Sequence, residues 1–191
     1  MSMIEWTAAA LGAVCVVLVV RRSLWNYPFA LLSVALLGWV FLHARLYSDA
    51  ALQVFYLVIN GYGWWSWAGS REQAGEVVVD RLGWAQRAGW VTGCVLLTLA
   101  WGAMMHRLTD TPRPWWDAAV AIPSVAAQML LARRLVENWI GWIVVDCIAV
   151  PLYVSQALWA AAGLYVIYLA LSVWGLVDWH RVARLQGPVA A

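Results

Sequence analysis

Seven apolar runs of roughly 20 residues divide the chain, and this pattern constrains its fold more than any other feature. A helix rises about 1.5 Å per residue, so ~20 apolar residues are needed to cross the ~30 Å hydrocarbon core of a bilayer. The runs are Trp6–Val20, Tyr27–His43, Ala50–Ala68, Gln86–Met105, Trp115–Ala132, Asn138–Ala157 and Ala160–Asp178. The sequence therefore predicts an all-α integral membrane protein, with seven transmembrane helices in a single transmembrane domain over residues 1–191.

Composition excludes several classes of function. Hydrophobic residues make up 64% of the chain and charged residues 12%, against roughly 45–50% and 25% in soluble domains. No basic run exists that could follow a phosphate backbone, so the lipid bilayer, and not nucleic acid, is the expected partner. Each of the three cysteines lies inside an apolar run, away from histidine or a second cysteine, so no metal, cofactor or disulfide is expected. No HExxH or GxSxG motif occurs, so we do not expect an enzyme.

The basic residues predict an orientation in a bacterial inner membrane. All twelve are arginine, and they lie between the apolar runs. One side of the predicted membrane collects Arg21, Arg22, Arg71, Arg81, Arg87, Arg133, Arg134, Arg181 and Arg184, and the other side has Arg45, Arg107 and Arg113. Because arginine accumulates in cytoplasmic loops, the C-terminus is predicted inside and the N-terminus outside. The first run follows Glu5 instead of a basic segment, so we interpret it as a span and not as a signal peptide.

The chain repeats itself at an offset of 112 residues. The offset places Asn26 on Asn138, Leu52 on Leu164, Val54 on Val166, Tyr56 on Tyr168, Gly63 on Gly175 and Trp67 on Trp179. Four spans further along, the chain is again on the same side of the membrane, so the two repeats are parallel. This predicts a 3+1+3 arrangement, with repeat one at about 6–68, a linker span at about 86–105 and repeat two at about 115–179. Parallel repeats with a substrate site at their interface are an architecture of transporters.

A polar stripe runs along the sixth apolar run. Trp139, Trp142, Asp146 and Tyr153 are three, four and seven residues apart, so they fall on one face of a helix. An acid inside a span is costly and usually faces a water-filled path or a partner. Beside tryptophan rings it favours a flat cation, each ring contact being worth about 0.5–2 kcal/mol. The alternative is a structural carboxyl that is protonated or paired with an arginine.

A second polar stripe lies on the third run and consists of Gln53, Tyr56, Asn60, Trp64 and Trp67. Its amides can both donate and accept hydrogen bonds, which suits an amide or sugar hydroxyls. They can equally bridge packed membrane helices, and the same alternatives hold for Gln128 in the fifth run. In the second repeat Tyr165 and Ser172 replace Gln53 and Asn60. Polar groups that differ between similar repeats are expected if one asymmetric ligand binds between them.

These residues resemble the bacterial PnuC family of vitamin B3 (nicotinamide riboside) transporters. The matching segments are Asn26-Tyr27 through Leu37-Gly38, Leu46-Tyr47, Leu52-Gln53-Val54-Phe55, Tyr62-Gly63-Trp64 with Trp67, Trp116-Asp117, and Val136-Glu137-Asn138-Trp139 with Trp142. The resemblance implies a seven-helix 3+1+3 fold like that of the SWEET sugar transporters, often trimeric. It also implies passive uptake of a non-phosphorylated vitamin that a cytoplasmic kinase then traps, with a site that includes Gln53, Asn60, Asn138, Trp139 and Trp142.

The first hypothesis is therefore facilitated diffusion of nicotinamide riboside. Thiamine is the nearest alternative ligand, and relatives that carry riboflavin or deoxynucleosides leave the vitamin open. A different class, the substrate-binding subunit of an energy-coupled vitamin importer, would need an ATPase partner. The full set of candidate substrate-binding residues is Gln53, Asn60, Trp64, Gln128, Asn138, Trp139, Trp142, Asp146 and Tyr153.

Overall fold

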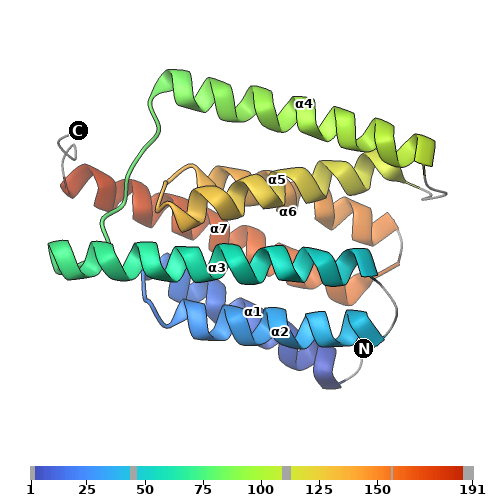
Figure 1. Cartoon of the computed structure of the whole chain (residues 1–191), viewed down its shortest axis with the longest axis horizontal. Coiled ribbons are helices and arrows are strands. Elements are labelled where there is room, and N and C mark those ends of the chain that lie inside the picture. The colour runs from blue at the N-terminus through green and yellow to red at the C-terminus, as the bar shows by residue number, and fades with distance from the viewer. Residues whose placement is uncertain (1–2, 44–46, 109–112, 156, 187–191) are drawn as a thin grey trace. The chain divides into compact units, whose positions relative to one another are not determined.

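The computed structural model describes residues 3–43, 47–108, 113–155 and 157–186 (Figure 1). Its helices are α1 (Met3–Val20), α2 (Asn26–His43), α3 (Tyr47–Ala74), α4 (Trp84–Leu108), α5 (Pro114–Ala132), α6 (Asn138–Ser155) and α7 (Trp159–Leu185). Within the described ranges, the β structure consists of one isolated bridge between Asp80 and Leu135. Over the described ranges, the prediction of an all-α chain with seven helices is confirmed.

Four helices are long and apolar enough to cross a membrane by composition alone. They are Trp84–Leu108, Pro114–Ala132, Asn138–Ser155 and the segment Ala161–Leu185 of α7. Shorter apolar stretches, Ala10–Val20 and Asn26–Trp39, lie in α1 and α2. In α3, the amides of the polar stripe and the polar end that contains Arg71 and Glu72 lower the mean hydropathy.

The chain forms two compact units. Unit 1 contains residues 1–78 with 132–134, and unit 2 contains residues 79–131 with 135–191. In unit 1, α2 packs against both α1 and α3, and in unit 2, α6 packs against α7. The two polar stripes therefore belong to different units, because one lies on α3 and the other on α6.

Helices α1 and α5 end in the same way. Arg22 and Arg134, which are 112 residues apart, both adopt a left-handed backbone, with φ of 53° and 61°. The next amide then turns back to the helix: Ser23 N donates to Leu18 O at 2.9 Å, and Leu135 N donates to Leu130 O at 3.0 Å. This six-residue closure is the Schellman motif, in which glycine is the usual left-handed residue. Arginine there costs roughly 1–2 kcal/mol of backbone strain, so other contacts must offset it.

The helices that follow these corners, α2 and α6, also begin alike. Nδ2 of Asn26 donates to Ser23 O at 2.6 Å, and Nδ2 of Asn138 donates to Leu135 O at the same distance. An asparagine side chain that binds the carbonyl three residues earlier fixes the angle at which the new helix leaves the turn. We call this shared arrangement the asparagine corner.

An aromatic pair follows each asparagine corner. The rings of Tyr27 and Trp67 meet edge to face at 5.4 Å and 89°, and those of Trp139 and Trp179 meet at 5.5 Å and 88°. Both tryptophans on the facing helices, Trp67 in α3 and Trp179 in α7, are fully buried. The residues that define the offset of 112 in the sequence thus make the same local contacts in both units.

Glycine allows each of these aromatic rings to approach the facing helix. A Cβ atom on Gly63 would lie 2.7 Å from Oη of Tyr27, and a Cβ atom on Gly175 would lie 2.5 Å from the ring of Trp139. Real Cβ atoms do not come this close to other heavy atoms, so no larger residue fits without a shift. The glycines of the repeat are therefore required by close packing.

Candidate functional site

The polar stripe of α6 packs against α7. The carboxylate of Asp146 accepts a hydrogen bond from Oγ of Ser172 at 3.3 Å, and only 2% of Asp146 is exposed. Further along, the ring of Tyr153 lies 5.0 Å from that of Tyr165, which lies 5.7 Å from that of Tyr168. The three tyrosine rings and the Asp146–Ser172 pair form a polar seam between α6 and α7.

Trp142 differs from its neighbours on the stripe because it is only half-buried. It lies one helical turn before Asp146, on the same face of α6. A large ring that is partly open can contact a ligand without leaving its rotamer. Within the α6 stripe, Trp142 and the half-buried Tyr153 have the most accessible aromatic surface.

At the start of α6, Asn138 and Trp139 are 0% and 1% exposed. Their buried atoms Oδ1 of Asn138 and Nε1 of Trp139 have no hydrogen-bond partner among the described residues. An unsatisfied buried polar group costs about 1–3 kcal/mol. A ligand hydroxyl or amide that reached these atoms would pair with an acceptor and a donor on adjacent residues.

The polar stripe of α3 packs against α2 within unit 1. Gln53 lies beside Gly38, and Nδ2 of Asn60 donates to Tyr56 O one turn earlier at 2.8 Å. The ring of Trp64 stacks parallel to that of Tyr27, with centroids 6.4 Å apart, and 40% of Trp64 is exposed. Gln53 is half-buried and Asn60 is buried.

The predicted site residues thus fall into two groups. Gln53, Asn60 and Trp64 belong to unit 1, and Gln128, Asn138, Trp139, Trp142, Asp146 and Tyr153 belong to unit 2. Gln128 lies in α5 and is buried. Among the described residues, no cluster of three or more His, Cys, Asp or Glu side chains could hold a metal ion.

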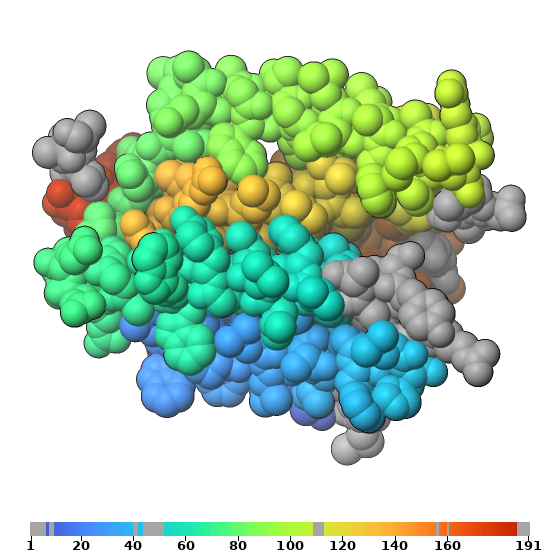
Figure 2. Space-filling view, in the orientation of Figure 1, coloured from blue at the N-terminus to red at the C-terminus, as the bar shows by residue number. Residues whose placement is uncertain are grey.

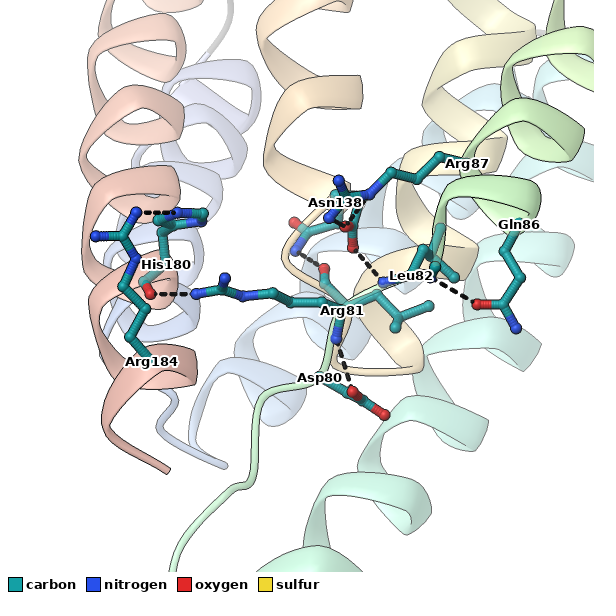
Figure 3. Close-up of polar contacts among 11 residues, drawn as sticks. Asp80, Arg81, Leu82, Gln86, Arg87, Asn138, His180 and Arg184 are labelled. Carbon is teal, nitrogen blue, oxygen red and sulfur yellow. Dashed lines mark hydrogen bonds and ion pairs between the residues drawn. The ribbon is translucent and has the colours of Figure 1, made fainter. Parts of the chain in front are cut away.

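A polar cluster around the α3–α4 linker was not predicted from the sequence. Glu137, which precedes α6, receives Nε of Arg87 at 2.9 Å and the backbone amide of Leu82 at 3.2 Å (Figure 3). Nη2 of Arg87 lies 2.7 Å from the same carboxylate. We call Leu82, Arg87 and Glu137 the linker clasp, because they join the linker and the first turn of α4 to the start of α6.

The linker is held by α7 as well. Nη2 of Arg81 donates to the carbonyl of His180 at 2.6 Å (Figure 3). Val79 N donates to Oε1 of Gln186 at 3.0 Å. Val136 N donates to Asp80 O at 3.0 Å. These contacts join residues more than 50 positions apart, so helical periodicity carries no signal for them. The one signal in the sequence was Glu137 itself, an acidic residue between two apolar runs in a chain whose other loops are rich in arginine, which indicates an ion pair.

The side chain of Arg134, whose backbone is left-handed, forms hydrogen bonds with α3 and with the linker that follows it. Its Nη1 donates to the carbonyl of Ser66 at 2.7 Å and to the hydroxyl of the same residue, and its Nε donates to Val78 O at 3.2 Å. Hydrogen bonds from a charged group are worth about 1.5–3 kcal/mol each. These contacts offset the backbone strain of the corner and fix the end of α3.

Amide, aromatic and carboxylate side chains inside apolar spans are typical of membrane proteins that bind and move a small polar molecule. The chain belongs to the nicotinamide mononucleotide transporter family, which it matches over residues 2–181. It is a multi-pass membrane protein of a bacterial transporter family. The resemblance stated from the sequence is thereby confirmed.

Individual relatives agree with this assignment. The nicotinamide riboside transporter PnuC of Escherichia coli (strain K12) is 28% identical, over 98% of this chain and 89% of that protein. The riboflavin/roseoflavin transporter RibM of Streptomyces davaonensis is 32% identical, over 91% of this chain and 83% of that protein. A crystal structure of the vitamin B3 transporter PnuC matches with a TM-score of 0.79 at 27% identity, covering 97% of this chain and 84% of that one. All three are transporters, as predicted, and not enzymes.

Proposed function

We propose that this protein takes up nicotinamide riboside by facilitated diffusion across the bacterial inner membrane. Phosphorylation by a cytoplasmic kinase then traps the vitamin and keeps its inward gradient. In this proposal all seven helices cross the membrane as two parallel repeats joined by α4, in the SWEET-like 3+1+3 arrangement, and the chain assembles as a homo-oligomer such as a trimer. The relatives named as nicotinamide riboside transporters and the duplicated asparagine corner support it.

The observation that carries the proposal is the buried carboxylate of Asp146 in α6. Oγ of Ser172 donates a hydrogen bond to Oδ2 of this carboxylate at 3.3 Å, and Trp142 lies one helical turn away on the same face of α6. The pyridinium ring of nicotinamide riboside is flat and positively charged. A carboxylate attracts this charge strongly where water is excluded, and an aromatic ring adds about 0.5–2 kcal/mol through its face.

The remaining candidates supply hydrogen bonds and ring contacts for the ribose and the carboxamide. We assign Gln53, Asn60 and Gln128 to donor and acceptor contacts, because amides offer both. The unpaired Oδ1 of Asn138 and Nε1 of Trp139 would take a hydroxyl or amide. Trp64 and Tyr153 offer aromatic surface.

Riboflavin is a second candidate, because RibM is 32% identical to this chain. Its ring system is neutral, so the charge of Asp146 would contribute nothing to its binding. Thiamine carries a positive ring and would use Asp146 and Trp142 as nicotinamide riboside does. The carboxylate therefore separates riboflavin from the two cationic vitamins, and direct binding must separate those two from each other.

Calorimetry on the purified protein, with nicotinamide riboside, thiamine and riboflavin titrated side by side, tests the ligand. Binding of nicotinamide riboside alone supports the proposal, whereas binding of only one of the other vitamins would replace the ligand. Uptake into vesicles without ATP then tests the mechanism. A strict requirement for ATP and a partner ATPase would indicate the substrate-binding subunit of an energy-coupled importer.

A further inference from the structure

Helix α4 is attached to the rest of unit 2 near both of its ends. At its start, the linker clasp joins Arg87 to Glu137. Near its other end, Gly102 lies against Trp115 of α5, so closely that a Cβ atom on this glycine would be 2.6 Å from the ring. Arg87 and Gly102 are 15 residues apart, which corresponds to about 22 Å of helix.

Between these attachments, α4 and α5 leave a groove of about 440 Å³. Its lining includes Gly89, Gly93, Cys94 and Leu97 of α4, and Ile122 and Met129 of α5. None of the described residues that line it carries a charge. The two helices lie side by side in Figure 2, where α4 is green to yellow-green and α5 is yellow to orange.

The shape and the apolar lining of the groove indicate what can fill it. The groove is open along one side and a helix is at least ~10 Å across, so a neighbouring helix would place only side chains in it. Water is a poor occupant, because a buried water needs two to four polar partners and apolar cavities stay dry. An empty groove would forfeit the dispersion contacts of its lining atoms. An unbranched hydrocarbon chain is thin, flexible and apolar enough to fit.

We propose that the groove between α4 and α5 binds one acyl chain of a bilayer phospholipid. Both walls are helices apolar enough to cross a membrane, so hydrocarbon is the medium beside them. The uncharged walls match the uncharged chain. The polar headgroup lies at the Gln86 end, because Gln86 is in the first turn of α4 and Trp84, which is 84% exposed, marks the level of the membrane interface.

The test uses the full-length protein in proteoliposomes that contain phosphatidylcholine with a diazirine on one acyl chain. After illumination, mass spectrometry maps the cross-linked residues. We expect the half-buried groove residues Trp90, Gly93 and Cys94 to be labelled about tenfold more than the exposed residues Val91, Val95 and Leu99 of α4, a difference of ~1.4 kcal/mol in occupancy. Equal labelling of both sets would overturn the proposal. Weaker labelling of the groove would also overturn it and would indicate that a second copy of the chain covers it.

A substitution that fills the groove provides a second test of the proposal. A Cβ atom on Gly93 meets nothing within 4 Å, and Gly93 lines the groove, so Gly93→Leu fills part of the groove. We expect this variant to lose about tenfold in groove labelling. Gly163→Leu on α7 is the matched control, because this glycine has the same free space but lies outside the groove. Unchanged labelling in the Gly93 variant would contradict the proposal, and Ala126→Leu fills the groove from α5 if Gly93→Leu fails to fold.

Discussion

At the scale of single residues, Trp142 is one of the two aromatic residues of the α6 stripe that are half-buried and open to a ligand. It is half-buried, whereas Trp139 and Asp146 beside it are almost completely covered. We expect Trp142→Ala to weaken binding of the vitamin by about tenfold, which corresponds to ~1.4 kcal/mol, without loss of expression. Calorimetry measures the affinity. Trp101→Ala on α4, where the ring is also partly exposed, should leave it unchanged, and an unchanged affinity for Trp142→Ala would remove this residue from the site.

The charge of Asp146 predicts a different kind of effect. Asp146→Asn keeps the shape and the contact with Ser172 but removes the negative charge. We expect nicotinamide riboside to lose about tenfold in affinity, or ~1.4 kcal/mol, while its uncharged dihydro form loses little. Parallel titrations of the two compounds measure the difference. Equal losses for both forms would mean that the carboxylate has a structural role only.

The glycine that faces Trp139 predicts an effect on stability. In Gly175→Ala the new methyl group would lie 2.5 Å from the tryptophan ring, so the ring or the helix must shift. Overpacking of this kind costs about 1–3 kcal/mol and should lower the thermal unfolding midpoint in detergent. Gly163→Ala, where the methyl group meets nothing within 4 Å, is the control. A midpoint equal to that of the control would show that α7 moves away freely.

At the scale of elements, the linker clasp predicts coupling between α4 and α6. Glu137→Gln keeps the size of the side chain but removes the ion pair with Arg87, whose side chain is 35% exposed. We expect a loss of about 1–2 kcal/mol, between the values for surface and buried pairs. A double-mutant cycle with Arg87→Gln, followed by thermal unfolding, isolates the interaction energy. Additive effects of the two substitutions would show that the pair contributes nothing beyond its separate side chains.

Hydropathy predicted the number of helices but not the ends of two of them. The third and seventh runs end at Ala68 and Asp178, whereas α3 and α7 continue to Ala74 and Leu185. Hydropathy reports where the hydrocarbon ends, but polar residues such as Arg71 and Arg184 are good helix formers and continue the helix into water. The contacts that hold the linker join distant parts of the sequence and leave no local pattern.

For the candidate site, periodicity identified the faces but not what covers them. The spacing of Trp139, Trp142 and Asp146 placed these residues on one side of a helix, as the structure has them. It gave no means to predict that the stripe packs against α7, because periodicity describes one helix at a time. The role of these residues in vitamin binding stays a prediction that the variants above test.

At the scale of the whole molecule, the distribution of arginine predicts the orientation in the membrane. With nine arginines on one side against three on the other, the C-terminus is predicted to lie in the cytoplasm. Green fluorescent protein fused to the C-terminus should fluoresce. It folds when it stays in the cytoplasm, whereas it does not become fluorescent when it is exported across the membrane unfolded. Alkaline phosphatase fused at the same position should be inactive. The opposite pair of results would reverse the assignment.

Because the asparagine corner occurs twice, the effect of a substitution in one half of the chain can be compared with the effect at the equivalent position in the other half. In a deep mutational scan, positions 26, 27, 63 and 67 should show the same tolerance profiles as positions 138, 139, 175 and 179, wherever folding alone selects the residue. Selection for uptake adds a second requirement that the two halves need not share. Positions at which the paired profiles diverge would mark the residues that recognise the vitamin, without any ligand-bound structure.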